Sequence, residues 1–247
     1  MKDRHGPVIV IGAHRSGTSA TAHALELLGL QIGEHLDSHH EPRPLQELHE
    51  EYLRQTGGAW HSPEPFLKLI ATADGLRDCV SYLQTNVERD FARIFGYRNN
   101  PAGLWLRLRM KFGAPWGWKE PRTTLFAPAW LELFPAARIV HVVRDPLAAA
   151  ESIRERELKF QAAGDPPTGS LADLQYCRQL VEMYLRAAER VANSPRYYRL
   201  QLEELQANPP AMLEQLANFC DLRPSTRDLA NAAASIRPAR VRSTRLC

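Results

Sequence analysis

The chain carries the stretch VIVIGAHRSGTS from Val8 to Ser19. Its four leading apolar residues predict a buried strand, and the part from Gly12 to Gly17 predicts a tight loop that opens a helix. Backbone N–H groups and the positive end of the helix dipole then point at one spot, which suits a bound phosphate. Because the two glycines have the spacing of a P-loop, we expect a phosphate site here.

One position separates this loop from the loops of proteins that use ATP or GTP. Those loops place a Lys directly after the second glycine, where it reaches the terminal phosphates, whereas this chain has Thr18 there. The positive charge comes earlier, at Arg15. We therefore expect a phosphate-binding loop that lacks the usual lysine contact to a terminal phosphoryl group.

The composition is that of one globular domain, expected over residues 1–247. The chain is 44% hydrophobic and 24% charged, which are globular values. Its formal net charge of +3 is mild for a nucleic-acid binder, and we expect no nucleic-acid partner. Its apolar runs are too short for a membrane span, and the first strand begins too early to leave room for a signal peptide. The four cysteines are scattered, which indicates reduced thiols in a cytoplasmic protein. The sequence does not specify the oligomeric state.

Predicted strands and helices alternate along the chain. The strands are expected at 8–11, 116–119, 138–143 and 197–202, and the helices at 18–28, 45–55, 74–95, 123–131, from Pro146 onward, 171–191 and 210–220. This alternation indicates an α/β fold with a mostly parallel central sheet flanked by helices.

Three cations follow three of the predicted strands. Arg15 lies in the loop after the first strand, Lys119 ends the second, and Arg144 follows the third. In parallel sheets of this kind, ligands lie beyond the carboxyl ends of the strands. We therefore expect the three side chains to meet in one anion site.

A serine accompanies the last of these cations. Ser152 lies eight residues after Arg144, on the helix that begins at Pro146. Both side chains can then reach one phosphate near the end of the strand. This pair predicts a second phosphate position beside the P-loop.

Together these features resemble the superfamily of sulfotransferases that use 3′-phosphoadenosine-5′-phosphosulfate (PAPS), and its bacterial branch in particular. The resemblance rests on the motifs AHRSGTS from Ala13, WKEPRT from Trp118 and VVRDP from Val142, and on the block from Leu202 to Pro209. It implies a P-loop NTPase-like fold and transfer of a sulfuryl group to a hydroxyl or amine of a carbohydrate, peptide or small metabolite. It also implies that residues 31–113 form a helical insertion on the acceptor side.

The resemblance assigns two sets of donor-binding residues. They are, for the 5′-phosphosulfate, Arg15, Ser16, Gly17, Thr18 and Ser19, and, for the 3′-phosphate, Arg144 and Ser152. The transfer is expected to be in line and independent of a metal, so that the protein mainly positions the partners and stabilises charge on the leaving oxygen. Arg15 and Lys119 can supply that stabilisation.

The general base does not carry over from the superfamily directly. Tyrosylprotein sulfotransferases supply a catalytic Glu from a Gly-Glu-Glu that follows the first helix, whereas the similar position here reads Gly33-Glu34-His35. Glu34 and His35 are both chemically able to take the acceptor's proton, and Glu41 and Glu120 stand in reserve.

Several conspicuous residues have simpler explanations. His35, His39 and His40 lack a matching Cys or carboxylate pattern, so we expect no metal site from them. Trp116 and Trp118 are expected to pack in the core rather than to bind a sugar. The tail contains four arginines that either form a solvated face or close over the nucleotide: Arg237, Arg240, Arg242 and Arg245.

Two other functions remain as alternatives. A P-loop kinase of small molecules is disfavoured by Thr18 and by the lack of a convincing Walker-B-type Asp. A nucleotide-binding module without catalysis, on whose basic rim a partner protein docks, would use the same loop and the same cations.

Overall fold

A computed structural model describes residues 6–33, 36–37, 39–95 and 113–238 of the chain. Its strands are β1 (Val8–Ile11), β2 (Gly117–Lys119), β3 (Arg138–Val143) and β4 (Tyr197–Gln201). Its helices are α1 (Thr18–Leu27), α2 (Arg43–Gln55), α3 (Glu64–Leu69), α4 (Ala73–Ile94), α6 (Thr123–Leu133), α7 (Pro146–Ala162), α8 (Leu174–Glu189), α9 (Leu202–Ala207), α10 (Pro209–Phe219) and α11 (Thr226–Ser235).

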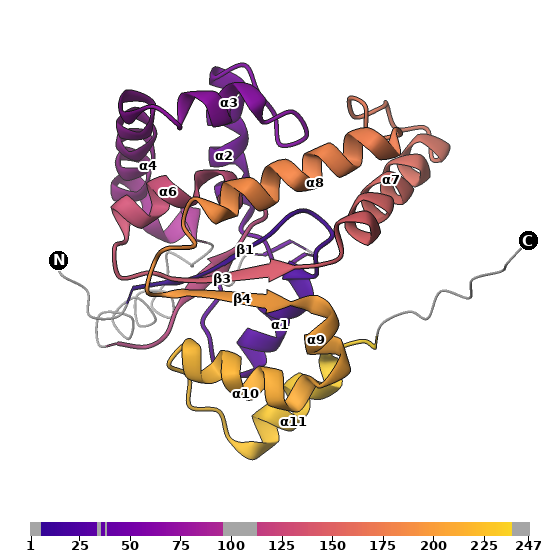
Figure 1. Ribbon diagram of the computed structural model, residues 1–247. Coiled ribbons are helices and arrows are strands. Elements are labelled where there is room, and N and C mark those ends of the chain that lie inside the picture. The colour runs from indigo at the N-terminus through magenta and orange to yellow at the C-terminus, as the bar shows by residue number, and fades with distance from the viewer. Residues whose placement is uncertain (1–5, 34–35, 38, 96–112, 239–247) are drawn as a thin grey trace, which may run out of the picture.

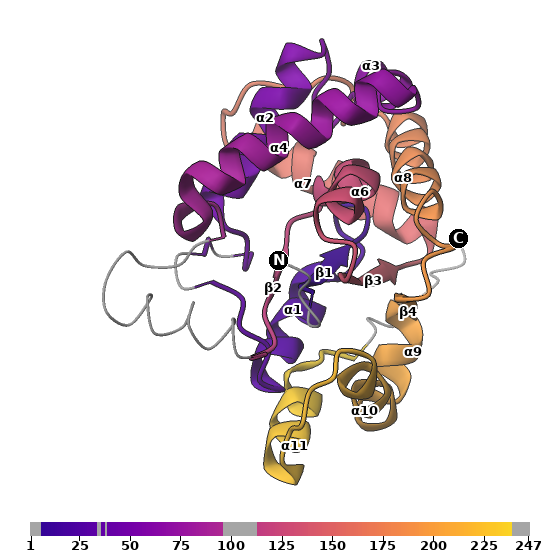
Figure 2. The same cartoon turned by 90° about the vertical axis from the view of Figure 1, so that its left-hand side faces the viewer.

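The four strands form one parallel sheet in the order β2-β1-β3-β4. Helices α2, α3, α4, α6, α7 and α8 lie on one side of this sheet, and α1, α9, α10 and α11 lie on the other (Figures 1 and 2). The predicted α/β fold with a parallel sheet covered on both faces is therefore confirmed.

Alternating side chains of the strands divide the interior into two cores. Ile9, Ile11 and Ile139 face the larger group of helices, whereas Val8 and Val10 pack against α1, α10 and α11. Successive residues of a strand point to opposite faces, so a strand that is covered on both sides must be apolar at every position. This explains the unbroken apolar run of β1.

The strand order also fixes where a ligand can bind. The chain leaves β1 to form β2 on one side and then crosses to form β3 on the other. The loops after β1 and β3 therefore diverge and leave a crevice between the carboxyl ends of these strands. The P-loop and Arg144 both lie at this point.

Some helices were not anticipated. The six-residue helices α3 and α9 are too short to show a periodic pattern, and α9 begins directly after β4, which ends at Gln201 instead of at residue 202. Helix α11 was not anticipated either, although its sequence contains a helix-start signal, since Ser225 and Asp228 form a capping box. The long helix α4 is interrupted by non-helical backbone at Asp90.

The two tryptophans pack in the core as the sequence predicts, and the described cysteines are also buried. Trp118 is completely buried and Trp116 is 6% exposed, so both pack in the core. Cys79, Cys177 and Cys220 are buried free thiols. Among the described residues, no helix combines the length and the apolar character that crossing a membrane requires.

Candidate active site

The loop after β1 is held against its neighbours by Gly12. The backbone of Gly12 has φ +152°, and a Cβ atom here would lie 2.5 Å from the carbonyl oxygen of Val142 on β3. The hydroxyl of Thr124 accepts a hydrogen bond from the Gly12 N–H at 2.8 Å and donates one to its carbonyl at 3.1 Å. A side chain larger than hydrogen would push the loop away from β3.

Gly17 forms the entrance to helix α1. It has φ +96°, and a Cβ atom would lie 2.6 Å from Leu202 Cδ1. None of the described side chains caps this helix, and its first turn contains no acidic residue. The first N–H groups of a helix lack partners within the helix, so these remain available to an anion.

Arg15 adopts a left-handed backbone conformation with φ +68°. This conformation costs a residue with a side chain about 1–2 kcal/mol, and the rest of the loop must impose it. The Arg15 guanidinium Nε donates a hydrogen bond to Ser152 Oγ at 3.1 Å. The carbonyl oxygen of Arg15 accepts a hydrogen bond from Arg144 Nη1 at 3.1 Å. The structure therefore joins the residues expected at the two phosphate positions in one hydrogen-bonded group.

A pocket of about 230 Å³ opens at this point. Its walls come from the P-loop, the segment before α2, the loop before α6, the loop after β3, helix α7 and the start of α9. They consist of His14, Arg15, Gly17, Thr18, Ser19, His39, Glu41, Pro121, Arg144, Arg156 and Leu202. Of the three cations expected to meet in one site, Arg15 and Arg144 line this cavity, whereas Lys119 is not among its described lining residues.

Lys119 lies beside this pocket and is completely buried. Its Nζ donates to Glu41 Oε1 at 2.6 Å and to Ser19 Oγ at 3.0 Å, and both of these residues line the pocket. Burial lowers the pKa of Lys119. Burial also raises the pKa of Glu41 to about 7, although the Lys119 ammonium opposes this change. Near neutral pH, Glu41 is therefore able both to hold and to accept a proton.

Glu120, a reserve candidate for the base, lies in a closed network instead. It accepts hydrogen bonds from Arg122 Nη1 at 2.5 Å and from His49 Nδ1 at 2.6 Å, while Trp130 Nε1 donates to His49 Nε2 at 3.1 Å. Burial raises the pKa of Glu120, but Arg122 and His49 outweigh it and bring the pKa to about 2. Glu120 is therefore a structural anion with almost no basicity.

Arg122 belongs to the same network. It pairs with Glu120 and with Glu50 on α2, at 2.6 Å from the latter. The two carboxylates neutralise the charge of Arg122, and these ion pairs tie α2 to the start of α6.

Comparisons with known proteins identify the family of the chain. A sequence model described as "Sulfotransferase family" matches residues 7–226. The chain belongs to the sulfotransferase family. No curated protein shows a significant sequence match.

Solved sulfotransferase structures share the fold of this family member. Sulfotransferase STF9 from Mycobacterium avium is 14% identical, with a TM-score of 0.54 over 94% of this chain and 68% of that one. The sulfotransferase domain of the Synechococcus PCC 7002 olefin synthase is 16% identical, with a TM-score of 0.51 over 94% and 80%. The sulfotransferase domain from the curacin biosynthetic pathway is 17% identical, with a TM-score of 0.51 over 95% and 83%. At these identities the likeness concerns the fold alone.

This sulfotransferase-family chain has two pocket residues that sequence reasoning missed. His14 is buried against Trp60 and Tyr184, and its Nε2 has no hydrogen-bond partner among the described residues. Burial, followed by the charges of Arg122 and Arg156, holds its pKa well below the usual range. Arg156 lies over the ring of Trp60, 5.5 Å from its centroid. Arg156 follows Ser152 by four residues on α7, so the two lie on one face of the helix, and this spacing could have identified Arg156 from the sequence.

Several predicted residues cannot be placed. Glu34 and His35, the first candidates for the general base, lie outside the described residues, as do Arg240, Arg242 and Arg245 of the tail. Arg237 is described, and its carbonyl accepts a hydrogen bond from Gln206 Nε2 at 3.0 Å. This contact anchors the start of the tail to α9.

Proposed function

We propose that the chain transfers a sulfuryl group from PAPS to a hydroxyl or amine of an acceptor. The observation that carries this proposal is the placement of Arg15 and Arg144 in one pocket at the N-terminus of α1. The P-loop has no Lys after Gly17, so its charge comes from arginines at the ends of β1 and β3. This distribution suits a donor with a phosphosulfate and a separate phosphate.

The polar groups of the pocket support a bound anionic donor. Ser16 Oγ is buried and has no hydrogen-bond partner among the described residues, and the first turn of α1 presents free N–H groups beside it. Buried polar atoms without partners are costly, so such a group indicates a ligand that satisfies it. Arg15, Ser16, Gly17, Thr18 and Ser19 would hold the 5′-phosphosulfate.

The second phosphate position involves Arg144 and Ser152. Arg144 lines the pocket and also holds the carbonyl of Arg15, while Ser152 accepts from the Arg15 guanidinium. These two residues would hold the 3′-phosphate, with Arg15 between the two ends of the nucleotide. PAPS, when bound, supplies the activated sulfuryl group.

Glu41 is the general base that this pocket favours. Its carboxylate lines the cavity, and its pKa of about 7 suits a group that must accept a proton near neutral pH. The acceptor oxygen or nitrogen forms a bond to sulfur, the bond from sulfur to the phosphate oxygen breaks, and the acceptor's proton passes to Glu41. Glu34 and His35 lie outside the described residues, so both also remain candidates for the general base.

Lys119 supplies positive charge on the same side of the pocket. Its ammonium group lies 2.6 Å from Glu41 and 3.0 Å from Ser19. A buried cation stabilises developing negative charge more strongly than a solvated one does. Lys119 and Arg15 would therefore stabilise the leaving oxygen, and no step here requires a metal ion.

The acceptor is expected on the side formed by residues 31–113. His39 and Glu41 from this segment already line the pocket, and Trp60 packs against His14 at its edge. A helical insertion that contributes the base would also shape the acceptor's access to it.

Thermal unfolding with adenosine 3′,5′-bisphosphate, compared with ATP plus magnesium, tests the proposal. A ligand that binds only the native state raises the melting temperature as its concentration rises above its dissociation constant. We expect stabilisation by the bisphosphate, and transfer of labelled sulfate from PAPS to at least one member of a hydroxyl and amine acceptor panel. Preference for ATP with magnesium would instead indicate a kinase. Bisphosphate binding without any transfer would favour a non-catalytic nucleotide-binding module.

A further inference from the structure

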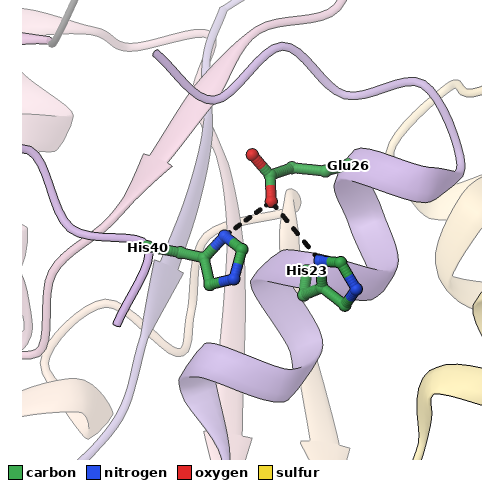
Figure 3. Close-up of side chains that lie close together, drawn as sticks. All are labelled: His23, Glu26 and His40. Carbon is green, nitrogen blue, oxygen red and sulfur yellow. Dashed lines mark ion pairs between the residues drawn. The ribbon is translucent and has the colours of Figure 1, made fainter. Parts of the chain in front are cut away.

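Three metal-ligating side chains meet on the surface of α1, outside the residues that line the pocket. Figure 3 shows His23 and Glu26 on this helix and His40 from the segment that follows it. Glu26 Oε2 lies 2.7 Å from His40 Nδ1 and 3.8 Å from His23 Nδ1. The centroids of the two imidazole rings are 5.1 Å apart. Both imidazoles thus turn the same nitrogen toward one carboxylate oxygen.

The spacing of these atoms is close to that of a tetrahedral metal site. Ligands about 2.0–2.1 Å from a Zn²⁺ ion lie roughly 3.3 Å from one another at tetrahedral angles. The observed separations of 2.7 and 3.8 Å fall on either side of that value, and all three ligand atoms lie within 4.8 Å of one another. The two separations from Glu26 Oε2 would therefore each change by only about 0.5–0.6 Å to admit an ion.

The backbone holds His40 in place for this contact. Asp37 Oδ1 accepts hydrogen bonds from the N–H groups of His39 and Glu41, at 2.8 and 3.0 Å, which forms a turn around His40. His40 itself has φ +61°, a left-handed conformation that a residue with a side chain adopts at a cost. The position of its imidazole is therefore set by the turn and not by free rotation of the chain.

The electrostatics also favour a cation. All three side chains are partly exposed, at 46% for His23, 26% for Glu26 and 33% for His40, so an ion can enter from solvent. A divalent ion beside Glu26 Oε2 would balance the negative charge of this carboxylate.

We propose that His23, Glu26 and His40 form a binding site for a transition-metal ion of the Zn²⁺ type. Two imidazoles and one carboxylate are ligands that Zn²⁺ and Co²⁺ favour, and three protein ligands leave a fourth position for water. Of the histidines weighed from the sequence, His40 takes part, His39 lines the pocket, and His35 lies outside the described residues. The other two ligands come from α1. The site was not visible in the sequence because its ligands span a turn whose path only the fold defines.

The metal would fix the segment that carries the proposed base. His40 directly precedes Glu41, whose carboxylate lies 2.6 Å from Lys119. An ion held jointly by α1 and His40 would tie this segment to the helix that begins at the P-loop. The site is structural in this role, because its three ligands are absent from the described lining of the pocket.

Zn²⁺ and Co²⁺ titrations of the untagged, chelator-treated chain test the proposal. Calorimetry is expected to show one saturable Zn²⁺ site per chain, and Co²⁺ is expected to give the visible absorption of a four-coordinate complex. His23→Ala, Glu26→Gln and His40→Ala should each weaken binding by more than the roughly tenfold to hundredfold cost of losing an outer-shell partner. His39→Ala is the matched control, because His39 is adjacent in sequence but outside the cluster, and it should bind the metal like the parent chain.

A thermal measurement keeps the test independent of variant stability. Each variant is first melted without metal to show that it folds, and the increase in melting temperature on adding Zn²⁺ is then compared with that of the parent chain. We expect an increase for the parent and for His39→Ala and none for the three ligand variants. The proposal is overturned if the parent shows no saturable site, or if folded ligand variants bind Zn²⁺ as tightly as the parent.

Discussion

Glu41 Oε1 accepts a hydrogen bond from Lys119 Nζ at 2.6 Å, and the two side chains are 9% and 0% exposed. These residues lie on opposite sides of the helical segment α2–α4 in the sequence, yet they form one ion pair beside the P-loop pocket. Burial raises the pKa of the carboxyl group and lowers that of the amine, so burial destabilises the charged forms of both partners.

Replacing Glu41 by Gln should abolish most of the transfer activity. If Glu41 accepts the acceptor's proton, the change removes a general-base contribution of about 10²–10⁴-fold in rate. Binding of adenosine 3′,5′-bisphosphate should stay within a few-fold, which calorimetry measures. Glu47→Gln is the matched control, because Glu47 is an exposed carboxylate on α2 that pairs with Arg93.

The pH profile of the same enzyme gives a second readout for Glu41. A base must be deprotonated to act, so the transfer rate should fall as the pH drops through about 7, the pKa of this carboxyl. Glu47→Gln should keep this acidic limb, whereas Glu41→Gln should lose it together with the rate. A Glu41→Gln enzyme with the parental rate and profile would assign the base elsewhere, to Glu34 or His35.

Lys119→Met should reduce turnover and leave nucleotide binding largely intact. The methionine fills the buried space of the lysine stem without its charge, so the change removes the stabilisation of the leaving oxygen that we propose for Lys119, worth about 10²–10³-fold. Single-turnover transfer of labelled sulfate and bisphosphate affinity separate the two effects. Parental turnover in Lys119→Met would remove Lys119 from the mechanism.

Arg144→Ala should weaken adenosine 3′,5′-bisphosphate far more than 5′-AMP. A charge-assisted hydrogen bond contributes about 1.5–3 kcal/mol, which corresponds to roughly 10–150-fold in affinity for the ligand that carries the 3′-phosphate. Arg186→Ala removes an exposed arginine on α8 and should change neither affinity. Equal losses for the two nucleotides in Arg144→Ala would show that Arg144 does not distinguish the 3′-phosphate.

Gly17→Ala should destabilise the fold by more than Gly29→Ala does. Both glycines have positive φ, +96° and +101°, but a Cβ atom at Gly17 lies 2.6 Å from Leu202, whereas one at Gly29 meets nothing within 4 Å. The difference in the free energy of unfolding therefore measures the steric cost, about 1–3 kcal/mol. Adding Leu202→Ala should recover part of it, and an unchanged cost in the double variant would contradict the steric explanation.

Glu120→Gln should lower stability at pH 7 by about 3–5 kcal/mol, because it leaves the buried Arg122 without its closest counter-charge. The parent chain should also lose stability in acid. The pKa of Glu120 falls from 4.5 to about 2 on folding, so its contribution is present above pH 4.5 and is lost as the pH falls toward 2. Denaturant titrations at pH 7 and pH 3 measure both effects, with the exposed Glu51→Gln as control. A stability difference that is as large at pH 3 as at pH 7 would contradict this origin.

Local sequence signals predicted the framework well. The apolar runs of β1 and β3, the glycines of the P-loop and the Pro at the start of α7 each express a preference of the backbone over a few residues. The short helices α3 and α9 were not predicted, because six residues contain too few turns to show a helical period.

Local sequence signals do not predict which glutamate can act as the general base. Glu41 and Glu120 are both glutamates in polar stretches, and both could serve as bases by type alone. In the fold, Arg122 and His49 give Glu120 a pKa of about 2, while burial gives Glu41 a pKa of about 7. These opposite environments come from neighbours far away in the sequence.

The sequence by itself determined the strand–loop–helix for which we propose phosphate binding, the parallel α/β fold and the cations at the strand ends. These features follow from short-range periodicity, from the backbone freedom of glycine and from the rule that parallel strands end at one edge. Only the tertiary structure decided that Lys119 pairs with Glu41, 78 residues away, and that His40 meets His23 and Glu26. Burial and side-chain partners depend on how distant segments pack, and no local pattern encodes that packing.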